Sequence, residues 1–127
     1  MHKLIFASVA LLLGAWSACA QDAAKGEQVF RKCIACHAVG EGARAKTGPQ
    51  LNGLFGRKAG TLPGYNFSAS YVNSGLVWDE QNFTTYIKNP QAMMPGSRMS
   101  FAGLQSEDEI KGLIAYLKQF TADGKKL

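Results

Sequence analysis

Apolar residues recur at helical spacing in three stretches of the chain. The clearest stretch carries Ile110, Leu113, Ile114 and Leu117 at the i, i+3, i+4, i+7 positions of one helix face. The segment Ser106–Glu109 just before it has the sequence of a capping box, whose side chains satisfy the free N–H groups of a helix start. The pattern therefore predicts a helix that begins after Ser106 and includes Leu117.

Two further helices are predicted upstream. Asp22 can cap a helix from about residue 23 to 32, because a short carboxylate side chain accepts hydrogen bonds from the first turn. Asp79 can cap another from about residue 80 to 88, which Asn89-Pro90 would end.

The rest of the chain reads as loops. Residues 68–73 predict one short helical turn before Gly75. Between Cys36 and Trp78, glycine and proline are frequent and no strand-like alternation of useful length appears. Such long loops rarely fold around their own side chains alone. We therefore expect an all-α domain of three main helices plus a short one, whose core is completed by a bound cofactor.

The first twenty residues have the pattern of an export signal. A basic start at residues 2–3 precedes the apolar run Leu4–Leu13 and the small-residue site Ala18–Ala20. We expect cleavage after Ala20, a signal peptide at residues 1–20, one domain at residues 21–127, and a periplasmic location. An uncleaved membrane anchor and lipidation at Cys19 are the less favoured alternatives.

Composition narrows the class of protein further. The chain has 127 residues, a formal net charge of +5, 46% hydrophobic residues and 18% charged residues. These values are ordinary for a globular protein and argue against a disordered tail, a collagen or a coiled coil. The length indicates one small domain, expected to be a monomer. Binding to nucleic acid would need a dense basic face, which the sequence lacks.

The candidate chemistry is concentrated in five residues. Outside the predicted signal, the cysteines and histidines are Cys33, Cys36 and His37 alone. Their spacing, C-x-x-C-H, is the attachment motif of c-type haem. On a helix end the two cysteines lie about one turn apart, so their sulfurs can reach the two vinyl groups of one porphyrin while His37 lies beneath the iron. We therefore predict one haem c, bound covalently through two thioethers.

Other uses of the motif fit less well. A dithiol redox site would need a βαβ context, and a zinc site usually needs four nitrogen or sulfur ligands. A simple disulfide would leave His37 without a role. For the sixth position of the iron no second histidine remains, so methionine, lysine, the N-terminus, water or nothing can occupy it. Met93, Met94 and Met99 cluster around a Pro-Gly turn, and spacing alone leaves all three open.

From about Gly26 to Phe120 the sequence resembles the soluble class I cytochromes c, mitochondrial and bacterial. The haem motif carries this resemblance together with the loop Lys46–Lys58, the pair Asn89-Pro90 and the segment Pro95–Gly103. The resemblance implies the cytochrome c fold, with the helices and long loops wrapped around one covalently bound haem.

The resemblance also implies roles for individual residues. His37 and Met99 would be the axial ligands of the iron. The remaining haem contacts would be the Pro49 carbonyl accepting from the His37 ring, Tyr86 bonding near the Met99 sulfur, and Arg57, Trp78 and Ser97 serving the propionates. Gly26 and Phe30 would pack against Tyr116 on the last helix.

Two positions depart from the commonest family pattern. Phe67 stands where the family often has a tyrosine that reaches a propionate. Tyr71 stands where an asparagine often anchors a buried water. The departures bear on the propionate and water network, and ligation is expected to be unaffected.

Ligation by histidine and methionine would saturate the iron, which favours electron transfer over catalysis. The predicted function is a soluble electron carrier between membrane-associated redox complexes, not an enzyme. A haem enzyme or sensor with an open sixth position, or a dissociable cytochrome subunit of an oxidoreductase, are the alternatives. Expected partners have acidic docking surfaces: a bc1-type complex as donor and a terminal oxidase or reductase as acceptor. The resemblance places four basic residues at the haem edge, in a thinner ring than mitochondrial members have: Lys32, Lys46, Lys88 and Arg98.

Overall fold

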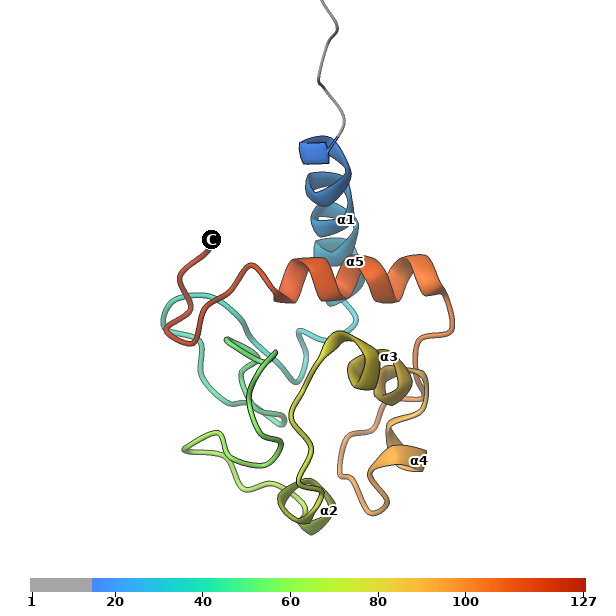
Figure 1. The fold of residues 1–127 in the computed structure, drawn as a ribbon. Coiled ribbons are helices and arrows are strands. Elements are labelled where there is room, and N and C mark those ends of the chain that lie inside the picture. Colours follow the sequence, from blue (N-terminus) through green and yellow to red (C-terminus); the bar gives the residue numbers. More distant parts are fainter. Residues whose placement is uncertain (1–14) are drawn as a thin grey trace, which may run out of the picture.

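The computed structural model describes residues 15–127, so most of the predicted export signal lies outside the described residues. Five helices follow one another along the chain (Figure 1). They are α1 (Ala15–Phe30), α2 (Ala69–Asn73), α3 (Glu80–Lys88), α4 (Pro90–Met93) and α5 (Glu107–Leu117). Within this part of the chain there are no named strands, only two isolated bridges, and no helix is long and apolar enough to cross a membrane. The predicted all-α class is confirmed.

The first and last helices cross at a point where both lack side chains. A Cβ atom on Gly26 would overlap the carbonyl oxygen of Gly112, so the two backbones touch directly. Next to the crossing, the rings of Phe30 and Tyr116 lie 5.4 Å apart between centroids. The expected packing of Gly26 and Phe30 on α5 is therefore present. Gly112, which the sequence did not single out, is the other half of the contact.

The predicted limits of the first helix are wrong at both ends. In the uncleaved chain the alanine-rich residues before Asp22 continue the helix, so Asp22 lies inside α1 and does not cap it. At the other end α1 stops at Phe30, where the chain tightens. Lys32 and Cys33 donate to carbonyls only three residues back, at 3.0 and 2.8 Å, as is common in a last helical turn.

The other helices begin where their caps predict. Asp79 accepts a hydrogen bond from the backbone of Asn82, whose side chain in turn accepts from the backbone of Asp79. Ser106 accepts from the backbone of Glu109 at the start of α5. Asn89-Pro90 ends α3 as expected, but it also begins α4, since proline is well suited to the first position of a helix.

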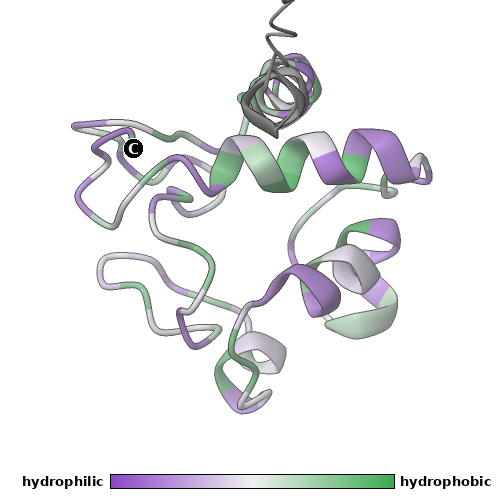
Figure 2. Ribbon diagram, turned by 45° about the horizontal axis from the view of Figure 1, so that its top comes forward, coloured by the Kyte–Doolittle hydropathy of each residue, from purple (hydrophilic) through white to green (hydrophobic). Residues whose placement is uncertain are grey.

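The hydrophobic core lies between α5, α3 and the end of α1. Figure 2 shows hydrophobic residues gathered in the C-terminal part of α5, with hydrophilic residues at its start. The apolar face predicted for this helix is buried, with Ile110, Leu113 and Leu117 no more than 2% exposed. Below α5 the long loops and the α3–α4 pair lie on different sides of the molecule (Figures 1 and 2). A cavity is lined by residues of the loops, of α3 and of α5.

Candidate haem site

One large cavity gathers residues from nearly every part of the described chain. Its wall is mostly apolar, with a few polar groups from the loops. All nine site residues that the sequence predicted contribute to it: Cys33, Cys36, His37, Pro49, Arg57, Trp78, Tyr86, Ser97 and Met99. Because these residues are spread over some 70 positions, only the tertiary fold brings them together.

The haem motif forms a single helical turn on the wall of this cavity. The backbone N–H groups of Cys36 and His37 both donate to the carbonyl of Cys33, at 3.1 and 2.8 Å. Cys33 and Cys36 are each half-buried and line the cavity together. The local winding expected from the C-x-x-C-H spacing is present.

The loop Gly48-Pro49 fixes the His37 ring. Nδ1 of His37 lies 2.7 Å from the carbonyl oxygen of Pro49, and since a carbonyl only accepts, Nδ1–H is the donor. A Cβ atom on Gly48 would overlap the ring, so glycine is needed for this close approach. Burial lowers the pKa of His37, which keeps the imidazole neutral. Nε2 is thus the nitrogen left for a metal.

The three methionines that spacing left open differ in position. Met94 is 2% exposed and packs in the hydrophobic core, and Met93 packs against that core. Neither contributes to the cavity wall, whereas Met99 does. Tyr86 on α3 donates a hydrogen bond to the Met99 sulfur at 3.0 Å. Burial, with the neighbouring Tyr71, raises the pKa of Tyr86, so its hydroxyl keeps the proton that it donates.

Two polar residues predicted to serve the propionates lie side by side. Trp78 donates its backbone N–H to the Arg57 carbonyl at 3.0 Å, and its own carbonyl accepts from Gly56 at 2.8 Å. The Arg57 guanidinium donates to the backbone carbonyl of Asn52. Ser97 also lines the cavity, and its hydroxyl contacts Tyr71 and the backbone of Met99, so its role at the propionates stays a prediction.

Sequence reasoning missed several residues that build the site. Asn52 is 3% exposed and both donates to and accepts from the backbone of Gly40, at 2.8 Å in each case. Gln91 donates to the carbonyls of Ser97 and Met99 at 2.8 and 3.2 Å. Tyr71 joins Tyr86 to Ser97. Of these residues, only Tyr71 could be singled out from the sequence, because it departs from the family pattern.

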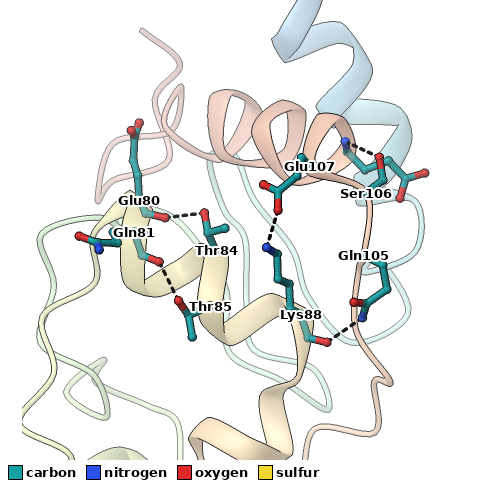
Figure 3. A network of polar contacts seen from close by, with 9 residues as sticks. Glu80, Gln81, Thr84, Thr85, Lys88, Gln105, Ser106 and Glu107 are labelled. Atoms are coloured by element: carbon teal, nitrogen blue, oxygen red, sulfur yellow. Dashed lines mark hydrogen bonds and ion pairs between the residues drawn. The ribbon is translucent and has the colours of Figure 1, made fainter.

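Ion pairs reduce the basic character of the expected rim. Lys32 pairs with Glu109 at 3.2 Å, and Figure 3 shows Lys88 at the end of α3 reaching Glu107 at the start of α5. Lys46 and Arg98 donate to the backbone carbonyls of Ile34 and Asn66, so their charges are not paired in this way.

The residues present fit a c-type haem. The cavity combines two thiols one helical turn apart, an imidazole with one nitrogen fixed and the other available, and a thioether from a distant loop. Its remaining wall is largely apolar, as a porphyrin requires. The fold and this donor set define the class of a haem protein with covalent attachment.

Comparison with known proteins gives the family. The cytochrome c family model matches residues 23–121. Cytochrome c2 of Blastochloris viridis is 51% identical over 126 residues, 99% of each chain, and a cytochrome c2 of Rhodoplanes tepidamans is 55% identical over 106 residues, 84% of this chain and 99% of that protein. Cytochrome cH from Methylobacterium extorquens superposes with a TM-score of 0.72 at 39% identity, covering 76% of this chain and 97% of that one.

The chain belongs to the cytochrome c family. It is an electron-transfer protein that carries one covalently attached c-type haem and exchanges electrons with redox partners. It acts as an electron carrier and not as an enzyme, as the sequence predicted.

Proposed function

We propose that His37 and Met99 are the two axial ligands of the haem iron and that Cys33 and Cys36 form the thioethers. The observation that carries this proposal is the hydrogen bond from Tyr86 to the Met99 sulfur, on the wall of the cavity that also holds His37. A thioether sulfur has two lone pairs, so it can accept from Tyr86 and still bind a metal. Met93 and Met94 do not line this cavity, which supports Met99 as the ligand.

This ligand set supports electron transfer in a specific way. When bound, the haem supplies an iron that cycles between the ferrous and ferric states. His37 is held through Nδ1 by the Pro49 carbonyl, and Met99 is held by Tyr86, so both ligands keep one geometry. A fixed, saturated coordination sphere needs little rearrangement when an electron moves. The neutral thioether and the apolar wall both disfavour the ferric charge, so we expect a positive reduction potential.

The polar residues near Arg57 complete the proposed haem contacts. Arg57 and Trp78 line the cavity and are joined through their backbones. We assign them to the propionates, whose negative charge a guanidinium favours. Ser97 lines the same cavity and accepts a hydrogen bond from the Met99 backbone N–H at 3.2 Å.

For location and partners we propose an exported, periplasmic carrier, cleaved after Ala20. The match to the Rhodoplanes tepidamans protein, which spans 99% of that protein but 84% of this chain, supports a mature domain at residues 21–127. The partners are acidic redox proteins, a bc1-type complex as donor and a terminal oxidase or reductase as acceptor. Because Lys32 and Lys88 are paired with glutamates, we expect only moderate electrostatic steering.

The test is the absorption spectrum of the purified haem protein in both redox states. Sulfur ligation gives a weak ferric band in the far red, which should be present in the wild type. Met99→Ala should abolish the band, and Met93→Ala, a matched change six residues away, should retain it. A wild type without the band, or a ferrous form that readily binds carbon monoxide at neutral pH, would instead indicate an open sixth position and the sensor or enzyme alternative.

A further inference from the structure

A closed ring of hydrogen bonds runs from the backbone nitrogen of Met99 to the sulfur of the same residue. Its backbone nitrogen is 3.2 Å from Ser97 Oγ, which is 2.6 Å from the hydroxyl of Tyr71. The Tyr71 hydroxyl is 2.7 Å from that of Tyr86, which is 3.0 Å from the Met99 sulfur. The ring joins α2, α3 and the loop after α4 on one side of the cavity.

The Met99 sulfur and the Met99 backbone N–H together fix which group donates and which accepts in every hydrogen bond of the ring. A thioether sulfur can only accept, so Tyr86 must donate to it, and a backbone N–H can only donate, so Ser97 Oγ must accept. Since the Tyr86 hydrogen is used, Tyr71 must donate to Tyr86. Ser97 must then donate to Tyr71. No other arrangement of the three hydroxyl hydrogens satisfies all four contacts.

We propose that Tyr71 is a positioning residue for Met99. Its hydroxyl keeps Tyr86 oriented as the donor to the sulfur, and through Ser97 it ties the loop backbone to α2. Hydrogen bonds arranged in one direction polarise and strengthen one another, so Tyr71 also strengthens the bond at the sulfur. The inference rests on the proposed ligation by Met99.

The outer side of the same loop is held as well. Gln91 on α4 donates to the carbonyls of Ser97 and Met99 at 2.8 and 3.2 Å. The loop backbone is therefore fixed from the solvent side by Gln91 and from the cavity side by Tyr71. Gln91 is exposed, whereas Tyr71 is half-buried and lines the cavity, so the contact from Tyr71 is the better shielded from water.

Two consequences follow for a ligated Met99. A hydrogen bond to the sulfur draws electron density away from the metal and favours the less charged ferrous state, so the ring should raise the reduction potential. Holding the loop should also make Met99 harder to displace by an added ligand. Both effects should decrease when the Tyr71 hydroxyl is removed.

The experiment uses the haem-loaded wild type and two variants, Tyr71→Phe and Tyr65→Phe. Tyr65→Phe is the matched control, because it removes a hydroxyl that bonds to the Thr47 carbonyl at 2.8 Å outside the ring. The reduction potential and the affinity of the ferric protein for imidazole, which competes with Met99, are measured for each. Tyr71→Phe should lower the potential and raise the affinity for imidazole by about two- to tenfold, the equivalent of one net hydrogen bond. Tyr65→Phe should leave both values unchanged.

The outcomes separate this inference from the proposed ligation. If the wild type lacks the far-red band, Met99 is not a ligand and both proposals fail. If the band is present but Tyr71→Phe matches the wild type in potential and affinity, or if Tyr65→Phe shifts both equally, only the role of Tyr71 is overturned. Should Tyr71→Phe not fold, Ser97→Ala interrupts the ring one bond earlier and should shift both values in the same direction.

Discussion

The crossing of α1 and α5 and the loops around the cavity are stabilised in different ways. At the crossing, Gly26 and Gly112 bring two helix backbones into contact, and apolar side chains fill the space around them. The loops are instead held by polar side chains bonded to backbone groups, such as Asn52 on Gly40 and Gln91 on Met99. Regular helices satisfy their own backbone, so they need only packing. Irregular loops need a partner for each buried group and, here, a large cofactor between them.

Removing the two cysteines that attach the haem should have the largest effect on stability. The loops around the cavity should lose the most order. A double Cys33→Ala, Cys36→Ala variant cannot form thioethers, so the apolar cavity loses the group that fills it. We expect loss of cooperative unfolding by circular dichroism and fast amide exchange throughout residues 38–78. Slow exchange retained there would show that the loops order themselves without the haem.

A substitution at the crossing of α1 and α5 should have the next largest effect on stability. Gly26→Ala places a methyl group against the Gly112 carbonyl, where neither backbone can yield. Overpacking of this kind costs about 1–3 kcal/mol, and backbone contact places this change at the upper end. The free energy of unfolding from guanidinium titration measures the cost. Gln28→Ala, at an exposed position of the same helix, is the control and should be within about 0.5 kcal/mol of the wild type.

Asn52→Ala is the corresponding test in the loops around the cavity. It leaves the N–H of the half-buried Gly40 without its partner, while the Gly40 carbonyl keeps its bond from the Ala43 N–H, and the expected cost is about 1–3 kcal/mol. Unlike Gly26→Ala, it should increase amide exchange near residues 38–52 and leave α5 protected. Equal loosening of α5 would contradict the division of the molecule into two independently stabilised regions.

The smallest effect is expected at the surface, at the exposed ion pairs of the first turn of α5. Glu107→Gln and Glu109→Gln release Lys88 and Lys32 from exposed ion pairs, so stability should change by no more than about 1 kcal/mol. Freed lysines should speed electron transfer to an acidic partner at low salt, and the gain should vanish at high salt. Stopped-flow rates across a salt series test this. Glu41→Gln, which neutralises an exposed glutamate without releasing either lysine, is the control for net charge.

The helices were largely predictable because their signals are local. The apolar spacing of Ile110 to Leu117 and the caps at Asp79 and Ser106 each lie within one or two turns, and the structure confirms them. The limits of α1 were wrong because Asp22 can cap a helix or lie within one, and its own side chain does not decide between the two. In the uncleaved chain the residues before Asp22 continue the helix, and cleavage after Ala20 would remove most of them.

By itself the sequence determined the class of protein, through five adjacent residues whose covalent chemistry depends on spacing alone, and the order of the helices. The tertiary structure brings Met99 to the cavity wall and leaves Met93 and Met94 off it, in line with what the family resemblance implied, and it alone paired Gly26 with Gly112 and closed the ring through Tyr71. Those outcomes depend on contacts between residues far apart in the chain. Such contacts have no local pattern, because a side chain meets its distant partner only when the whole backbone has folded.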